Sequence, residues 1–128
     1  MVAIDLGGAA PPSEQIYQQL RGLILSGRIA AGERLPTVRQ LARDLGVAPG
    51  TVARAYKQLE LESYVQTRAR GGTTVLTSPQ SLPAEVLKAA RALHDAAVRH
   101  GTSLDDSIAT LTGIWDSDGG ANDATSSN

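Results

Sequence analysis

The chain has 128 residues, no cysteine and a formal net charge of −1, which leaves room for one domain with a small appendage and excludes disulfides and thiolate metal sites. No apolar run approaches the ~20 residues of a membrane-spanning helix, and no signal peptide is visible, so we expect a cytoplasmic protein without membrane contact. The charge is uneven, because residues 13–76 carry +4 and residues 77–128 carry −4, which indicates that the first part faces an anionic partner.

The N-terminal residues predict an arm followed by a helix. Residues 1–12 contain a Gly-Gly and a Pro-Pro pair and are expected to form an extended arm. Ser13 is a good N-cap for a helix that ends near Gly27, where a C-terminal glycine belongs. The apolar positions of this helix recur at helical spacing, at Ile16, Leu20, Leu23 and Ile24.

The next two elements are predicted to be short amphipathic helices joined by a glycine turn. Thr37 and Gln40 form a capping box at the start of the first helix, and Gly46 ends it. Pro49 suits the first position of the second helix, which we place over residues 49–62. Its buried stripe is expected at Val52, Ala55, Tyr56 and Leu59.

A β-hairpin is predicted to follow these helices. Residues 64–67 and 73–76 are rich in β-branched side chains and flank a basic, glycine-rich turn. Pro79 breaks the pattern after the hairpin. We therefore expect a compact domain over residues 13–78.

Residues 79–116 are predicted to form a helical segment that associates with a second copy. Two helices are expected here, the second capped by Ser103, and both are too short to bury their apolar faces against each other. They must therefore pack on the first domain, on another copy, or on both, and the alanine-rich face of residues 86–97 favours the dimer because it allows close helix approach. Residues 117–128 are polar and small and are expected to be disordered. The expected dimerisation residues are Val86, Ala90, Leu93, Ala97, Leu104, Ile108, Leu111 and Trp115.

Two helices, a glycine turn and a basic hairpin are the parts of a winged helix-turn-helix, in which the second helix enters the major groove of DNA. Arg54 suits bidentate contact with guanine, and Lys57 suits contact with phosphate. The alternatives are a solvated helix face for these two cations and an ion pair of Arg39 with Glu60 or Glu62. For the wing, which is the hairpin turn at residues 68–72, the alternative is a mobile basic loop. The complete set of expected DNA-binding residues is Thr37, Arg39, Pro49, Gly50, Thr51, Arg54, Lys57, Arg68, Arg70, Gly71 and Gly72.

The chain resembles the GntR family of bacterial transcription regulators over roughly residues 13–76. The residues that carry the resemblance are Gln15-Ile16, Gly27-Arg28-Ile29, Gly32-Glu33-Arg34-Leu35-Pro36, Arg39-Gln40-Leu41-Ala42, Thr51-Val52, Ala55-Tyr56, Leu59-Glu60, Gly72-Thr73 and Val75. The form Thr51-Val52-x-Arg54-Ala55-Tyr56, with a short helical tail, is similar to the YtrA-type subfamily. The resemblance implies a winged helix-turn-helix, a homodimer and repression of nearby transport genes.

The sequence departs from the family pattern at the helix and the wing that would contact DNA. Pro49 and Gly50 stand where many members have a basic residue, and Ala53 is neutral where many are basic. Arg70 stands where the wing commonly has a glycine. The operator sequence therefore cannot be transferred from relatives.

We expect a mainly α protein with a small β-hairpin, in which a winged helix-turn-helix is followed by a two-helix dimerisation segment. The expected function is sequence-specific DNA binding by a homodimeric repressor of a nearby operon. The alternative is a winged helix that contacts another protein, but such modules usually lack a basic face. We expect no enzymatic activity, cofactor or metal, because no catalytic constellation is visible and His94 and His100 do not share a helical face. The sequence identifies no small-molecule effector.

Overall fold

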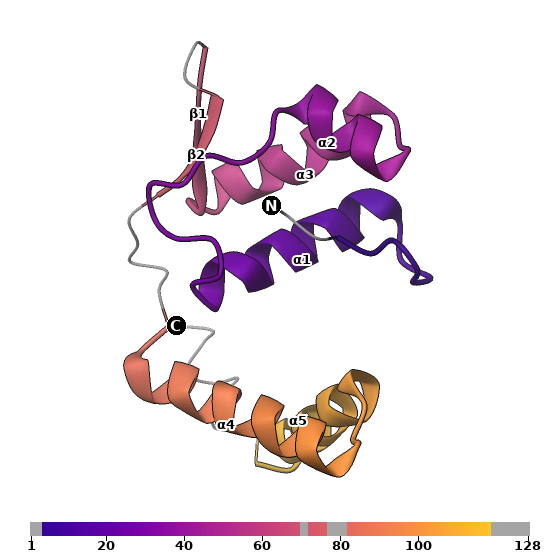
Figure 1. Cartoon of the computed structure of the whole chain (residues 1–128), viewed down its shortest axis with the longest axis vertical. Helices are drawn as coiled ribbons and strands as arrows, with labels where there is room; N and C mark the ends of the chain where they lie inside the picture. Colours follow the sequence, from indigo (N-terminus) through magenta and orange to yellow (C-terminus); the bar gives the residue numbers. More distant parts are fainter. Residues whose placement is uncertain (1–3, 70–71, 77–81, 119–128) are drawn as a thin grey trace. The chain divides into compact units, whose positions relative to one another are not determined.

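The computed structural model describes residues 4–69, 72–76 and 82–118. The chain forms two compact units, Met1–Leu82 (unit 1) and Pro83–Asn128 (unit 2). Figure 1 shows the elements of unit 1, which are α1 (Pro12–Leu25), α2 (Val38–Leu45), α3 (Pro49–Leu61), β1 (Val65–Arg68) and β2 (Gly72–Val75). Unit 2 contains α4 (Ala84–His100) and α5 (Leu104–Asp118).

The core of unit 1 is built around α3, which packs against both α1 and α2. The stripe predicted on α3 is confirmed, because Val52, Ala55, Tyr56 and Leu59 are all buried. Ile16 and Leu20 of α1 meet this stripe and are completely buried. Burying such aliphatic side chains stabilises the fold by roughly 1.5–3 kcal/mol each. The apolar spacing of the sequence thus fixes which side of each helix faces inward.

The ends of α2 and α3 follow the predicted capping signals. The Thr37 hydroxyl accepts a hydrogen bond from the Gln40 backbone N–H at 3.1 Å, and Gly46 ends α2 in the left-handed conformation with a φ of 68°. Pro49 is the first residue of α3, and Ala48 precedes it without a side-chain cap. The predicted end of α3 at residue 62 is one residue too late, because Glu62 is its C-cap.

The start of α1 differs from the prediction. The helix begins at Pro12 with Pro11 as its N-cap, and Ser13 lies inside the first turn. Proline is favourable at this point because its fixed φ is already helical and its missing N–H needs no partner. Residue 12 therefore belongs to the helix and not to the arm.

The N-terminal arm lies against α1. The Gln19 side chain accepts a hydrogen bond from the Asp5 N–H at 2.9 Å and donates to the Asp5 carbonyl at 2.6 Å. The Gln15 side chain makes the same two-way contact with Gly8, at 3.1 Å in both directions. Half-buried Ile4 and Leu6 pack on the core. Residues 4–8 are thus held against α1 by hydrogen bonds and by apolar packing.

The hairpin is antiparallel, with Val65 opposite Val75 and Arg68 opposite Gly72. Both strands are shifted by about a residue from the predicted segments. The segment before α2, which was expected to be a loop, also pairs with β2: Arg34 and Thr74 form an antiparallel bridge, and the Leu35 N–H donates to the Thr73 carbonyl at 2.8 Å. Backbone pairing with a distant strand leaves no periodic signal in so short a segment.

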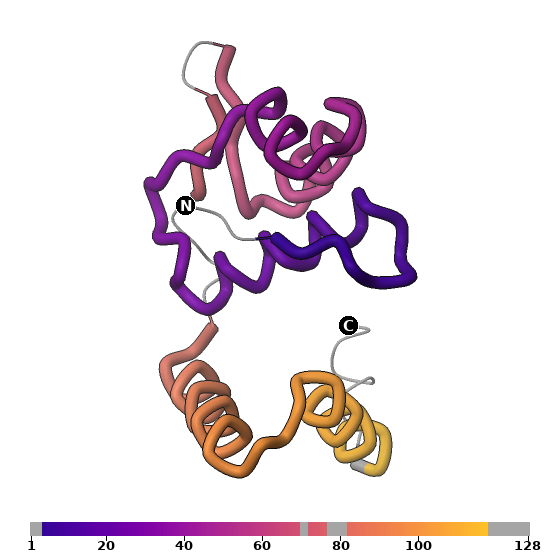
Figure 2. Tube along the Cα trace, turned by 45° about the vertical axis from the view of Figure 1, so that its right-hand side comes forward, coloured from indigo at the N-terminus to yellow at the C-terminus, as the bar shows by residue number. Residues whose placement is uncertain are grey.

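Unit 2 consists of α4 and α5 joined by the short turn that Figure 2 shows. Gly101 ends α4 in the left-handed conformation. The Ser103 hydroxyl accepts from the Asp106 N–H at 3.0 Å, which is the cap that the sequence predicted. The helix α5 continues to Asp118, so residues 117 and 118 are helical and not part of a disordered tail. The rest of that predicted tail lies outside the described residues. No helix in the described part of the chain could cross a membrane.

Candidate nucleic-acid interface

Three of the predicted DNA-binding cations lie on the two helices of the helix-turn-helix. Arg39 is exposed in the first turn of α2, and Arg54 and Lys57 are exposed on α3, on the side away from its buried stripe. Because 3.6 residues make a turn, the core spacing leaves residues 54 and 57 on the outer face. The amphipathic pattern therefore presents cations to solvent from both helices.

These three cations, and Arg68 at the end of β1, have no partner among the described residues and can therefore bind an external anion. The side chains of Arg39, Arg54, Lys57 and Arg68 form no salt bridge or hydrogen bond with another described residue. The alternative ion pair of Arg39 with Glu60 or Glu62 is not present in the described part of the chain. Glu60 accepts from the Thr67 N–H at 3.1 Å, and Glu62 accepts from Tyr17 and Gln58. Unpaired surface cations of this kind supply the salt-dependent affinity for phosphate.

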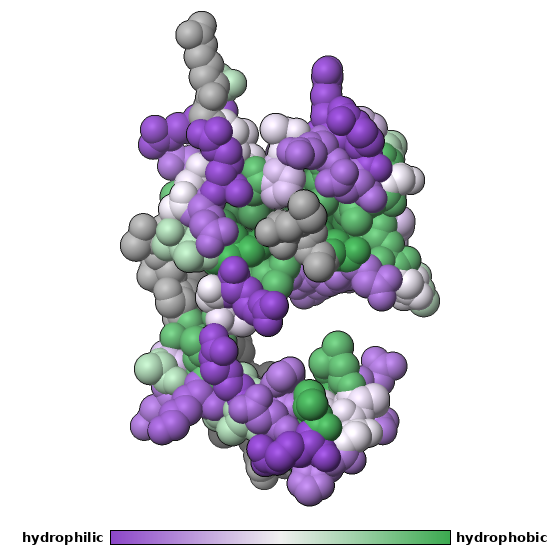
Figure 3. All heavy atoms as spheres, in the orientation of Figure 1, coloured by the Kyte–Doolittle hydropathy of each residue, from purple (hydrophilic) through white to green (hydrophobic). Residues whose placement is uncertain are grey.

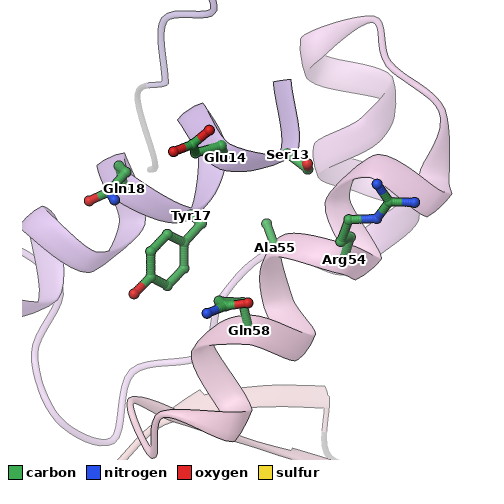
Figure 4. Close-up of a pocket in the computed structure, with 7 residues that line it drawn as sticks. All are labelled: Ser13, Glu14, Tyr17, Gln18, Arg54, Ala55 and Gln58. Atoms are coloured by element: carbon green, nitrogen blue, oxygen red, sulfur yellow. The ribbon is translucent and has the colours of Figure 1, made fainter. Parts of the chain in front are cut away.

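Arg54 lies at the edge of a pocket between α1 and α3. The pocket has a volume of about 270 Å³ and is lined by Ser13, Glu14, Tyr17, Gln18, Arg54, Ala55 and Gln58. Figure 4 shows the guanidinium of Arg54 near Ser13 at the start of α1, while Tyr17 and Gln58 lie further along the two helices, on either side of the space between them. Arg54 thus lies on the flank of α3 that is nearest to α1, which the sequence could not indicate.

The remaining predicted positions on the helices are all at helix starts. Thr37 is exposed, but its hydroxyl caps α2, so one of its acceptor lone pairs is already used. Pro49 and Gly50 are exposed in the first turn of α3, and Thr51 is half-buried behind them. The backbone N–H groups at the start of a helix carry partial positive charge, which favours phosphate there.

The described part of the wing contributes one of the predicted arginines. Arg68 is the last residue of β1 and is exposed. Gly72 begins β2 with a φ of 71°, so a side chain at this position would be strained. Arg70 and Gly71, two further predicted contacts, lie outside the described residues.

Arg34 is a further cation at the wing, and it is not among the DNA contacts expected from the sequence. Its side chain lies alongside the wing, where its Cδ is 3.6 Å from the position that a Cβ on Gly72 would take. The side chain is exposed, and no other described residue pairs with it. The sequence placed Arg34 in a loop, and only the pairing of that loop with β2 brings it to the hairpin.

Tyr56 fixes α3 relative to the segment that leads into α2. Its hydroxyl donates to the Pro36 carbonyl at 2.7 Å, while its ring is buried in the core. Burial raises the pKa of Tyr56 well above its ordinary value of 10.0, so the phenol stays neutral and remains a donor. The spacing between the two helices therefore depends on a hydrogen bond as well as on packing.

The predicted dimerisation residues are mostly exposed in this single chain. Figure 3 shows hydrophobic side chains at the surface of unit 2, and the six large ones among those predicted are 38% to 74% exposed. No residue of α4 is buried, and α4 and α5 make few contacts with each other. Six of the eight predicted residues line one groove of about 260 Å³ between these helices, namely Ala90, Leu93, Ala97, Leu104, Ile108 and Leu111.

Residues 12–75 match the family described as "Bacterial regulatory proteins, gntR family". Over 75 residues the chain is 41% identical to the HTH-type transcriptional repressor YtrA of Bacillus subtilis, and the match covers 59% of this chain and 58% of that protein. The matches to two further regulators cover 16% of the probable rhizopine catabolism regulatory protein MocR of Rhizobium meliloti and 60% of the HTH-type transcriptional regulator Rv1152 of Mycobacterium tuberculosis. The chain thus spans less than two thirds of these relatives.

Solved structures agree with this assignment. The GntR-family transcription factor YtrA from Sulfolobus acidocaldarius is 33% identical and superimposes with a TM-score of 0.55, covering 73% of this chain and 97% of that one. The DNA-binding domain of AraR in complex with the operator ORE1 is 25% identical, with a TM-score of 0.50, and covers 57% of this chain and 92% of that chain. These neighbours share the winged-helix architecture described above.

Proposed function

The chain belongs to the GntR family of bacterial regulatory proteins, and from this premise we propose that it is a homodimeric, sequence-specific repressor of an operon near its own gene. Membership makes it a transcription regulator with a DNA-binding winged helix. The Bacillus relative is named a transcriptional repressor, and the AraR domain is bound to an operator, which supports repression and operator binding as parts of the proposal.

The observation that carries the proposal is the set of unpaired cations on three successive elements. Arg39 on α2, Arg54 and Lys57 on α3, and Arg68 on β1 are all exposed and without an intramolecular partner among the described residues. A module that binds proteins through an apolar surface does not need four such charges, whereas a module that binds the phosphate backbone of DNA does.

In the proposed complex, α3 lies in the major groove and the wing contacts the minor groove or the backbone. Arg54 contacts a base edge or the adjoining phosphate from the α1 side of the helix. Arg39 binds phosphate together with the N-terminus of α2, and Lys57 binds phosphate further along α3. Arg34 joins Arg68 beside the wing.

The exposed apolar residues of α4 and α5 support the homodimer part of the proposal. A second copy would cover the groove that these helices leave open, and it would bring two copies of α3 to half-sites about one helical turn apart. Engaging both half-sites together raises the affinity well above that of one subunit.

The test is binding to DNA from the region upstream of the protein's own operon, measured by fluorescence anisotropy at several salt concentrations. Arg54→Ala should weaken specific binding by about 1–3 kcal/mol and reduce discrimination between sequences, and Lys57→Ala should weaken all sequences similarly and lower the salt slope by about one. The matched control is Arg99→Ala, which removes the same charge from the last turn of α4.

Equal binding by the wild type and the Arg54→Ala/Lys57→Ala double variant, at matched salt, would overturn the proposed role of α3. A loss in the Arg99→Ala control as large as in either α3 variant would mean that net charge alone drives the binding, and not this surface.

A further inference from the structure

The turn from α3 into the wing is held in an unusual backbone conformation. Ser63 has a φ of 65°, the left-handed region that non-glycine residues rarely adopt. Around it the Ser63 N–H donates to the Glu60 carbonyl at 3.0 Å, and the Tyr64 N–H donates to the Leu59 carbonyl at 2.9 Å. These two bonds are those of a Schellman motif, which closes the helix and sets the direction of the chain that leaves it.

Two side chains of α1 hold the residues on either side of Ser63. The Tyr17 hydroxyl donates to the Glu62 carboxylate, and Arg21 Nε donates to the Tyr64 hydroxyl at 3.0 Å. The Arg21 guanidinium also stands over the Tyr64 ring, 5.7 Å from its centroid. Because Tyr17 and Arg21 are four residues apart on one helix, they lie on the same face and reach the two neighbours of Ser63 together.

The other contacts of this turn strengthen the arrangement. The Glu62 carboxylate also accepts from the Gln58 side chain at 2.7 Å, so that Tyr17 of α1 and Gln58 of α3 both donate to it. Tyr64 is buried, so its ring cannot turn away from Arg21 without opening the core. A strained residue persists only where its surroundings hold it, and here α1 holds both sides.

We propose that Tyr17 and Arg21 are positioning residues that fix the direction of the wing relative to α3. This inference rests on the proposed function, because the direction matters only if both elements contact one DNA molecule. The wing leaves the turn as β1, a strand of four residues or about 13 Å, so a small rotation at Ser63 displaces Arg68 at its far end. The two side chains would therefore act on DNA affinity through the wing without touching DNA.

A double-mutant cycle between Tyr17→Phe and Arg68→Ala tests the proposal in the full chain. Phenylalanine keeps the ring and removes only the hydroxyl. We expect Tyr17→Phe alone to weaken operator binding roughly 3- to 10-fold, and to have less than about a 2-fold effect once Arg68 is alanine, because the wing contact is already lost. Arg21→Lys, which keeps the charge but not the planar donor group, should behave in the same way. Gln18→Ala is the control, since Gln18 follows Tyr17 and its side chain makes no hydrogen bond to a described residue.

A second measurement does not involve DNA. Residual dipolar couplings of the free protein report the direction of the Gln66 and Thr67 amides relative to those of α3. We expect Tyr17→Phe and Arg21→Lys to change this direction, and Gln18→Ala to leave it unchanged.

The outcomes separate the two proposals. If Arg68→Ala binds DNA as well as the wild type, the proposed wing contact is wrong, and the dipolar couplings then decide the positioning role. Additive losses in the cycle, or couplings that do not change in either α1 variant, would overturn the positioning role and leave Tyr17 and Arg21 as stabilising residues only.

Discussion

Ser63 occupies a backbone conformation that glycine usually fills, and this gives a prediction at the scale of a single residue. Ser63→Gly should stabilise unit 1 by about 1 kcal/mol, because the left-handed conformation costs an L-residue about that much. The reverse change at Gly27, which has a φ of 78° and open space around it, should lose a similar amount as Gly27→Ser. Thermal melts of both variants against the wild type measure the two changes. A stabilised Gly27→Ser variant, or an unchanged Ser63→Gly variant, would contradict the argument.

The hydrogen bond from Tyr17 to Glu62 predicts a pH dependence of stability. Burial, with help from the hydrogen bond to Glu62, raises the pKa of Tyr17 from 10.0 to about 12. The contribution of the neutral Tyr17 hydroxyl to the free energy of unfolding is therefore complete below pH 10 and is lost as the pH rises toward 12. The hydrogen bonds from Tyr17 and Gln58 lower the pKa of Glu62 below its ordinary value of 4.5, so that contribution is present above pH 4.5 and is lost as the pH falls.

Urea unfolding at a series of pH values tests this pair. Tyr17→Phe should cost about 1 kcal/mol at pH 7, and the cost should shrink as the pH falls below 4.5. A cost that stays constant from pH 7 to pH 3 would mean that the hydroxyl acts through packing and not through the carboxylate. Gln18→Ala again serves as the control.

At the scale of elements, α2 and α3 owe their boundaries to local signals, whereas the N-terminal arm owes its order to α1. Gln15 and Gln19 each present one acceptor and one donor to the arm backbone, and they do so one turn apart. The arm backbone thus donates and accepts hydrogen bonds as a β-strand does, but its partners are two side chains and not a neighbouring strand. Such an arrangement orders the arm without requiring a particular arm sequence beyond the two apolar residues that reach the core.

The double variant Gln15→Ala/Gln19→Ala should release the arm and destabilise unit 1 by about 1–2 kcal/mol. Hydrogen exchange should become fast at the Asp5 and Gly8 amides, and proteases should cut residues 4–10 more rapidly. The control Gln18→Ala removes an amide from the same helix and should change neither. Slow exchange at Asp5 in the double variant would show that Ile4 and Leu6 hold the arm without the glutamines.

The helix α5 begins at a cap that the sequence predicts, but its interior contains residues that disfavour a helix. Gly113 lies in its interior, and three hydroxyls donate to carbonyls four residues earlier, an arrangement that slightly destabilises helices. The apolar residues of α5 are exposed in one chain. We therefore expect α5 to gain much of its stability from association.

At the scale of the whole molecule, the proposed dimer predicts the behaviour of a shortened chain. A protein ending at Ser78 keeps all the core residues found buried in the described part of the chain, so it should remain folded, but as a monomer. Its operator affinity should fall by roughly 10²- to 10⁴-fold, because the two half-sites are no longer engaged together. Light scattering and anisotropy measure the two effects.

The full-length variant Leu93→Asp/Leu111→Asp provides the matched comparison, because it keeps the chain length and adds charge to the apolar groove. It should also be monomeric and bind weakly. If the shortened chain remains a dimer in light scattering, the interface lies in unit 1, and the proposed role of α4 and α5 is wrong.

The sequence by itself determined the helices, the buried stripe of α3, the caps at Thr37, Gly46 and Ser103, and the existence of the hairpin. These features follow from spacing and from backbone preferences that act within a few residues. The family resemblance rested on the same local signals, and the match over residues 12–75 confirms it.

Only the tertiary structure decided the features that join distant segments. The pairing of the Arg34 segment with β2, the arm on Gln15 and Gln19, and the hold of Tyr17 and Arg21 on the turn at Ser63 all link residues far apart in the chain. The position of Arg54 on the flank of α3 nearest to α1 likewise depends on how two distant segments pack. A sequence pattern reports which side of an element is buried, because burial repeats with the period of the element. It does not report which element lies opposite, because that choice depends on how all the buried faces pack together.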